Sequence, residues 1–284
     1  EVGAVYAQDQ IEFNPQWQAV AGLRFDAFSL QYTNQRTGEY LGRRDNLISP
    51  RAGLIFKPRP TMSVYASYSV SYLPSSGDQF SSLTTVTQQV KPEKFTNFEV
   101  GAKFDLQRDV FLTTAVYQLD RTNTRATDPN DATRIVQTGS QRSQGAEIGL
   151  NGTITKLWTA AAGYAYQDAY ISSATAAARA GARVAQVPKH SFSLWNKCQI
   201  APRLSAGLGL IHRGDVFAAI DNTVTLPAFT RVDAALYYTF SSQWRAQVNV
   251  ENLLDRRYTL NADSNTNLSP GSPRSVRVGF STRF

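Results

Sequence analysis

The chain has 284 residues, of which 42% are hydrophobic and 18% charged, with a formal net charge of +7. Cys198 is the single cysteine, which excludes an intrachain disulfide, and two histidines with one cysteine are too few for a usual zinc site. The basic residues are scattered singly, without a recognisable nucleic-acid module, so the charge does not indicate nucleic-acid binding. No apolar run reaches the roughly 20 residues of a membrane helix, but a transmembrane β-barrel needs only short alternating strands.

Apolar and polar residues alternate with a period of two along almost the whole chain, which is typical of β-strands. The alternation predicts thirteen strands, in chain order at 2–13, 16–31, 47–57, 61–72, 94–106, 109–122, 134–154, 157–171, 189–200, 203–213, 228–240, 243–253 and 274–284.

The predicted connections alternate between short and long. Tight turns are expected at Asn14-Pro15, Pro58-Arg59-Pro60, Gln107-Arg108, Thr155-Lys156, Ala201-Pro202 and Ser241-Ser242. Long loops are expected at 32–46, 73–93, 123–133, 172–188, 214–227 and 254–273. Short turns at one end and long loops at the other are the layout of an outer-membrane β-barrel. Since single-chain bacterial barrels have even strand numbers, thirteen strands predict part of a larger barrel, with the other strands before Glu1.

Aromatic residues gather beside the predicted tight turns. Three of the four tryptophans follow such a turn within two residues, and several phenylalanines lie just before one. This pattern predicts a membrane girdle; the alternative is that the rings only staple hairpin ends. The predicted girdle residues are Trp17, Trp158, Trp244, Phe13, Phe56, Phe104, Phe240 and, at the end of the last strand, Phe284.

Six stretches, taken together, resemble TonB-dependent siderophore receptors. They are KPEKFTNFEVGAKFDL (91–106), QRSQGAEIGLNG (141–152), VPKHSFSLWNK (187–197), LPAFTRVDAALYY (226–238), VNVENLLDRRY (248–258) and the closing SPGSPRSVRVGFSTRF. The third and fourth are similar to segments of the ferric-catecholate subgroup. The strand that ends at Phe284 also resembles the C-terminal signal read by the barrel-assembly machinery of Gram-negative bacteria.

The resemblance implies an all-β, antiparallel up-and-down barrel of about 22 strands, plugged by an N-terminal globular domain. Residues 1–284 are then expected to be the C-terminal part of the barrel domain, with the plug and the first strands absent. The implied function is outer-membrane transport of ferric siderophores, with the catecholate type favoured. TonB, ExbB and ExbD would energise it through the plug, and iron would be cargo rather than a cofactor. A passive porin-like channel is the alternative.

Catalysis has little support in the sequence. A barrel hydrolase needs a serine or an acid beside a poised histidine, and the only histidines are His190 and His212. Both are expected to face outward on adjacent strands. If opposed positions sum to 402 across the Ala201-Pro202 turn, the two histidines oppose each other near the outer rim. They could pair around a metal by chance, but polar contact with lipopolysaccharide head groups is favoured, so we expect no enzyme.

Ligand contacts are expected in the long loops and the upper lumen. Ferric siderophores are anionic or polar and often carry catecholate rings, so cationic and aromatic side chains suit them. The alternative for each residue is a solvated rim charge that pairs with lipopolysaccharide phosphates. The candidates are Tyr40, Arg43 and Arg44 in the first long loop, Arg179 and Arg183 in the loop 172–188, and Arg256, Arg257 and Tyr258 at the start of the last loop.

Overall fold

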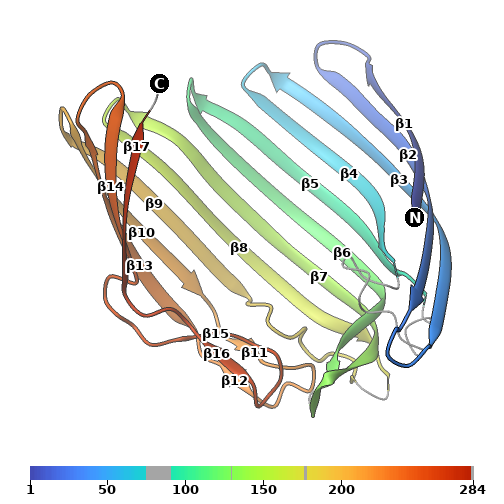
Figure 1. Ribbon diagram of the computed structural model, residues 1–284. Coiled ribbons are helices and arrows are strands. Elements are labelled where there is room, and N and C mark those ends of the chain that lie inside the picture. Colours follow the sequence, from blue (N-terminus) through green and yellow to red (C-terminus); the bar gives the residue numbers. More distant parts are fainter. Residues whose placement is uncertain (75–90, 129, 176–177, 283–284) are drawn as a thin grey trace.

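A computed structural model describes residues 1–74, 91–128, 130–175 and 178–282. Thirteen strands form one antiparallel sheet in which each strand pairs with the next along the chain (Figure 1). They are β1 (Val2–Glu12), β2 (Trp17–Thr33), β3 (Tyr40–Arg59), β4 (Met62–Leu73), β5 (Glu93–Gln107), β6 (Val110–Asp128), β7 (Asp131–Thr155), β8 (Trp158–Ser173), β9 (His190–Ala201), β10 (Leu204–Arg213), β13 (Phe229–Thr239), β14 (Trp244–Glu251) and β17 (Ser275–Thr282).

The sheet curves into a tilted wall whose two edges are β1 and β17, so it does not close on itself (Figure 1). Two small ribbons, β11 (Val216–Phe217) with β12 (Thr225–Leu226) and β15 (Thr259–Ala262) with β16 (Leu268–Pro270), lie in the long connections. None of the described residues forms a helix that is long and apolar enough to cross a membrane.

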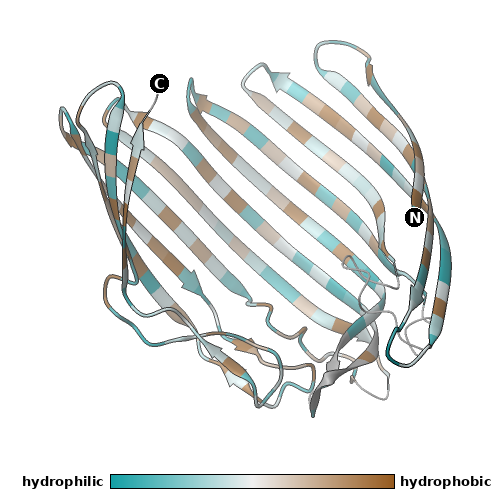
Figure 2. Ribbon diagram, viewed as in Figure 1, coloured by the Kyte–Doolittle hydropathy of each residue, from teal (hydrophilic) through white to brown (hydrophobic). Residues whose placement is uncertain are grey.

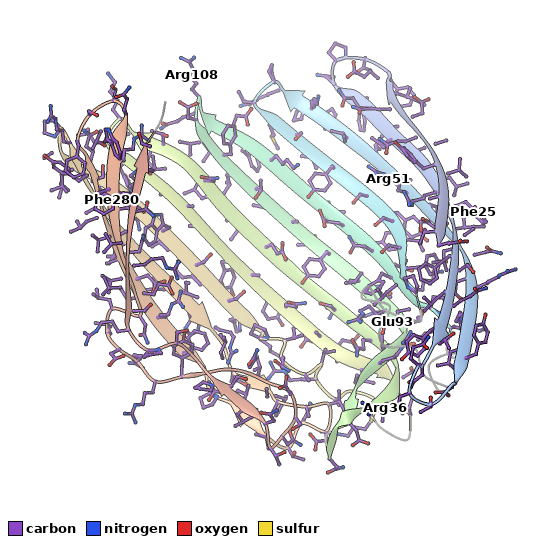
Figure 3. The ribbon with its side chains drawn as sticks, in the orientation of Figure 1. Phe25, Arg36, Arg51, Glu93, Arg108 and Phe280 are labelled. Atoms are coloured by element: carbon purple, nitrogen blue, oxygen red, sulfur yellow. The ribbon has the colours of Figure 1, made fainter. Side chains whose placement is uncertain are left out.

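All thirteen predicted strands are confirmed as strands of this sheet. The tight turns lie together at one end of the wall and the longer connections at the other (Figure 1). Figure 3 labels Arg108 at the tight-turn end and Arg36 at the long-loop end. As predicted, the short connections therefore lie at one end of the wall and the long connections at the other.

Two predicted loop ranges, 32–46 and 123–133, were wrong because the neighbouring strands extend into them. β3 begins at Tyr40 rather than near residue 47, and Tyr40 pairs with Thr33. β6 runs to Asp128 and β7 begins at Asp131, so most of 123–133 is strand. Cross-strand hydrogen bonds continue on the long-loop side well past the length that a bilayer needs, about 9–11 residues per strand. Most of the predicted loop 73–93, and Phe284, lie outside the described residues.

The two faces of the wall differ in chemistry, because successive side chains point to opposite faces. In β2, Leu23 and Phe25 lie on the outer face, with Arg24 and Asp26 on the inner face. Figure 2 shows the resulting alternation along the strands. Leu23 is 54% exposed and Phe280 72% exposed, and Figure 3 shows Phe25 and Phe280 on the outer flanks. An exposed, apolar outer face is the arrangement that a lipid bilayer covers.

Candidate ligand-binding site

An arginine cluster lies on the inner face near the long-loop end of β3, β5 and β6. It consists of Arg43 and Asp45 from β3, Glu93 from β5, and Arg121 and Arg125 from β6. The strand register brings β5 and β6 together here, because Phe95 pairs with Arg121 and so places Glu93 beside it on the same face. Glu93 lies inside the curve of the wall (Figure 3).

Glu93 is the carboxylate that joins β5 to β6. Its Oε2 lies 2.6 Å from Arg121 Nη2, and its Oε1 accepts a 3.2 Å hydrogen bond from the backbone N–H of Arg125. The Arg121 guanidinium also lies over the Phe95 ring, 4.9 Å from its centre. A charged pair and a cation–π contact therefore fix the Arg121 side chain at the inner surface.

The cluster holds three guanidinium groups and two carboxylates, so it carries a net positive charge. Arg43 Nη2 lies 2.8 Å from Asp45 Oδ1, and the Asp45 and Glu93 residues are only 7% and 4% exposed. Arg125 lies near the long-loop end of β6, and its burial lowers the pKa of the guanidinium; Glu93 opposes this shift and Arg43 adds to it. Planar, forked donors with excess positive charge suit an anionic, oxygen-rich ligand.

A second group, the aromatic stack, lies on the inner face of β10 and β13. The Arg213 guanidinium lies 4.8 Å from the Phe229 ring centre, and Phe229 stacks on Tyr258 with the ring centres 4.3 Å apart. Arg231 Nη1 lies 3.5 Å from the Tyr258 hydroxyl, and its Nη2 pairs with Asp233 at 2.7 Å.

The aromatic stack attaches the last long connection to the wall. Arg213 donates to the backbone carbonyls of Leu260 and, at 3.0 Å, of Thr259. Tyr258 lies against Gly271, where an added Cβ would come within 2.1 Å of the ring. Both contacts need the backbone of 252–274 in its observed position, so this segment is held against β10 and β13.

Asn252 closes the base of the same connection. The residue is 1% exposed and its φ is 52°. Its Nδ2 donates to the carbonyls of Arg256 (2.9 Å) and Ser272 (3.0 Å), and its Oδ1 accepts from the Arg256 N–H (2.9 Å). Asn252 therefore bonds both ends of the connection, a turn role that asparagine suits because it tolerates positive φ.

The described parts of the last three long connections pack together into what we call the loop lobe, residues 174–175, 178–189, 214–228 and 252–274. Asn222 accepts a 2.7 Å hydrogen bond from the Arg183 N–H and donates to its carbonyl at 2.9 Å. Gln186 bonds Ala262 across 76 positions of sequence. Two apolar clusters fill the interior, one of Ile171, Ala178, Ala182 and Ile220, the other of Val216, Ala218, Leu226 and Ala262.

The structure separates the predicted ligand residues. Arg43 lies in the arginine cluster, whereas Tyr40 and Arg44 lie in β3 on the opposite, outer face. Tyr258 belongs to the aromatic stack. The remaining four lie in the loop lobe: Arg183 pairs with Asp215 at 3.4 Å, and Arg179, Arg256 and Arg257 are exposed.

Glu93, Arg121 and Arg125 were absent from the predicted site. Residues 123–133 were predicted to be a loop, which placed Arg125 outside any strand. The alternation of polar and apolar residues could have placed Glu93. When the pattern is continued back from Glu99, Glu93 falls on the polar face of β5, on the same side of the sheet as the polar face of the neighbouring strand β6.

The predicted opposition of the histidines is wrong. The tight turn lies at Pro202 and Arg203 rather than at Ala201-Pro202, so His212 pairs with Phe192 on β9, and His190 pairs with Tyr166 on β8. His190 Nδ1 lies 2.9 Å from the Tyr164 hydroxyl, and His212 Nδ1 lies 2.9 Å from Thr230 Oγ1. No group of three or more metal-ligating side chains occurs in the described ranges.

Several of the predicted girdle residues lie beside tight turns on the outer face. Trp17 contacts Phe56 with ring centres 4.5 Å apart, and Trp158 Nε1 donates to Asn196 Oδ1 at 3.1 Å. Trp17, Trp158 and Trp244 are 38%, 39% and 52% exposed. The fourth tryptophan, Trp195, covers two inner-face glycines instead. Their contact with a membrane interface stays a prediction.

The family model and the related sequences that match this chain all point to the same protein family. Residues 1–253 match the model of the TonB dependent receptor-like β-barrel. The chain is 29% identical to the probable TonB-dependent siderophore receptor PiuA of Acinetobacter baumannii and 31% identical to the probable TonB-dependent receptor BfrD of Bordetella pertussis, in each case over 100% of this chain and 41% of the relative.

Solved structures agree with these matches. The crystal structure of PiuA from A. baumannii superimposes with a TM-score of 0.86 at 28% identity, over 99% of this chain and 43% of that one. The closed form of the ferric-catecholate import receptor Fiu from E. coli K12 gives a TM-score of 0.83 at 25% identity, over 100% of this chain and 44% of that one. The chain spans about two-fifths of the length of these relatives. It belongs to the TonB-dependent receptors and is an all-β, outer-membrane barrel chain.

Proposed function

We propose that the receptor containing this chain imports an anionic ferric siderophore, and that the arginine cluster contacts that ligand. The observation that carries the proposal is the net positive charge of the cluster on the inner face at the long-loop end. The names of the relatives PiuA and Fiu support a siderophore as the cargo. Iron is then carried as substrate, and the chain needs no cofactor for this role.

A ferric catecholate is the favoured cargo. A tris-catecholate complex of iron(III) is a trianion with aromatic rings at its surface, so guanidinium groups supply both charge and stacking. Fiu is named as a ferric-catecholate import receptor. Its alignment covers the whole length of this chain and 44% of the Fiu chain. Arg121, which already lies over Phe95, presents the combination of cation and ring that such a ligand needs.

Energy is proposed to come from TonB, ExbB and ExbD through a plug domain; the name of the matched family supports the dependence on TonB. The chain would form the C-terminal part of the barrel around that plug. The barrel-assembly machinery would recognise the strand that includes β17, and lipopolysaccharide would surround the outer rim. An enzyme activity is not part of the proposal, since the histidines bond Tyr164 and Thr230 on the outer face.

A growth and binding test addresses the cargo directly. Iron-starved cells that lack other receptors would express the complete receptor and receive one ferric siderophore at a time, a tris-catecholate or a tris-hydroxamate. We expect growth with the tris-catecholate only, and no growth when tonB is deleted. Rescue by hydroxamates alone would refute the catecholate assignment. Rescue that persists without TonB would instead support a passive porin-like channel.

A further inference from the structure

The β6–β7 hairpin contains a kink at the height where it extends past its neighbours (Figure 1). β5 pairs with β6 only as far as Thr122, and β8 pairs with β7 only as far as Ser140. Just beyond these residues, the β6–β7 register shifts on both sides of the pair that Thr124 forms with Gly139. A bulge of this kind bends a hairpin and increases its local twist.

Two residues in left-handed backbone conformation form the kink. Asn123 has a φ of 59°, and Gly139 on the opposite strand has a φ of 77°. Glycine adopts this conformation freely, and asparagine is enriched there among the other residues. At Gly139 an added Cβ would also lie 2.7 Å from Ser173 Oγ. The fully buried Thr124 donates from its Oγ1 to the Gly139 carbonyl at 2.9 Å, which joins the two strands at the bend.

The start of β5 holds the kink in place. The Asn123 side chain donates from Nδ2 to the Pro92 carbonyl at 2.9 Å. The backbone N–H of Arg125 donates to Glu93 Oε1 at 3.2 Å. Two successive residues of β5 and its approach therefore fix β6 on both sides of the bend.

The kink places Arg125 within the arginine cluster. The charged groups that act on its guanidinium are Glu93, Arg43 and Asp45. Arg121 lies before the bend and pairs with Glu93 Oε2 at 2.6 Å. A straight strand would separate Arg121 and Arg125 by roughly 13 Å, at about 3.3 Å per residue. In the kinked strand both residues bond the same carboxylate.

The opposite strand of the hairpin is held by β8 and the loop lobe. The Ser140 N–H donates to Ser173 Oγ at 2.9 Å. Val136 is partly buried and packs against the apolar cluster that contains Ile171 and Ala182. All of these contacts lie in the middle of the wall, away from its two open edges, β1 and β17.

We propose that Asn123 is a positioning residue for the ligand site: its left-handed backbone turns β6 so that Arg125 joins Arg43 and Arg121 as the third guanidinium of the cluster. This inference rests on the proposed function. Asn123 acts without touching the ligand, since its side chain bonds the Pro92 carbonyl. The side chain matters because few residues other than glycine keep the backbone in this conformation.

A double-mutant cycle in the complete receptor tests this role. Asn123→Val places a β-branched residue at a positive φ, whereas Asn123→Gly keeps the left-handed conformation and loses only the bond to Pro92. Arg125→Gln and the double variant Asn123→Val/Arg125→Gln complete the cycle. Asn151→Val is the matched control, since Asn151 lies in regular pairing with Phe111. The probe is a ferric tris-catecholate siderophore that carries radioactive iron.

We expect Asn123→Val and Arg125→Gln each to raise the dissociation constant about tenfold, with Asn123→Gly within about threefold of the unsubstituted receptor and the control unchanged. The double variant should bind as Arg125→Gln alone does, because Arg125 contributes nothing once it is displaced. A change that only destabilised the barrel would add its loss to that of Arg125→Gln.

Three results would overturn the positioning role. They are unchanged affinity in Asn123→Val or Arg125→Gln, additive losses in the double variant, and a loss in Asn123→Gly as large as that in Asn123→Val. Failure of the unsubstituted receptor to bind the probe would refute the proposed function instead, and this measurement precedes every variant.

A milder variant decides the matter if Asn123→Val does not reach the membrane. Thr124→Val keeps the side-chain shape and removes the Oγ1 hydrogen bond to Gly139. We expect it to weaken binding about threefold, and the loss should disappear in the Arg125→Gln background. Unchanged binding in Thr124→Val, or an equal loss in both backgrounds, would contradict the role of the kink.

Discussion

The arginine cluster and the aromatic stack both place arginines on the inner face near the long-loop end, but they use the charge differently. In the aromatic stack, Arg231 neutralises Asp233, and Arg213 donates to carbonyls of the loop lobe. In the arginine cluster, Arg43 pairs with Asp45, Arg121 pairs with Glu93, and Arg125 lies beside them as a third guanidinium. Each group has one more guanidinium than carboxylate, so the comparison teaches that excess charge alone does not identify a ligand site; in the aromatic stack the unpaired cation, Arg213, already donates to backbone carbonyls.

The largest expected effect is charge reversal in the arginine cluster. Arg121→Glu removes the partner of Glu93 and places a like charge beside it. We expect affinity for a ferric tris-catecholate to fall by about 100-fold, which corresponds to about 2.7 kcal/mol. Equilibrium binding of the radiolabelled complex to the complete receptor would measure it.

Arg108→Glu is the control, since it makes the same change in net charge at the tight-turn end (Figure 3). Equal losses in both variants would indicate general electrostatic attraction rather than a site.

The next effect concerns the loop lobe. Asn252→Ala removes three buried hydrogen bonds at the base of 252–274, and we expect it to destabilise the lobe by about 3 kcal/mol. Hydrogen exchange of 252–274 should rise strongly while β13 and β14 stay protected. Asn249→Ala, also on the inner face of β14, should leave exchange unchanged. Unaltered exchange in Asn252→Ala would show that the aromatic stack holds the segment without it.

A smaller effect is expected from salt, which should change ligand affinity at the arginine cluster but not the stability of the loop lobe. A tenfold rise in ionic strength, from about 0.05 M, shortens the Debye length roughly threefold. We expect ligand affinity at the arginine cluster to fall several-fold. Hydrogen exchange in the loop lobe should not change, because apolar burial and stacking dominate there. A salt-independent affinity would argue against charge recognition by the cluster.

The smallest effect is expected at Tyr258. Tyr258→Phe keeps the ring on Phe229 and loses only the 3.5 Å contact with Arg231, so lobe stability should be nearly unchanged. Tyr258→Ala loses the stacked pair, and we expect a cost of about 1 kcal/mol. Binding measured alongside would show whether Tyr258 also contacts the ligand, as its position in the sequence predicted. An equal cost for both variants would contradict the role of ring stacking.

The sequence predicted the strands well because alternation is a local signal. It placed all thirteen strands, yet it began β3 seven residues late, since a strand that extends past the bilayer loses its apolar face. The histidine register failed for another reason: the tight turn lies at Pro202 and Arg203 instead of Ala201-Pro202, a displacement that alternation does not reveal.

The loop lobe could not be predicted because its contacts are long-range. The hydrogen bonds of Asn222 with Arg183 and of Gln186 with Ala262 join loops far apart in sequence. Arg43 and Arg44 were both predicted to be ligand residues of the first long loop; in the structure both lie in β3, Arg43 on the inner face and Arg44 on the outer face. Side-chain parity, which separates these two neighbours, becomes informative only once the strand is known to include them.

Arg43 and Arg44 therefore provide the most direct measurement. Arg43→Gln and Arg44→Gln make the same chemical change at adjacent positions on opposite faces of β3. The dissociation constant of a radiolabelled ferric tris-catecholate would be measured for both variants of the complete receptor. We predict that Arg43→Gln weakens binding by about tenfold or more and that Arg44→Gln leaves it unchanged. Equal affinities, or a loss confined to Arg44→Gln, would contradict a ligand site on the inner face.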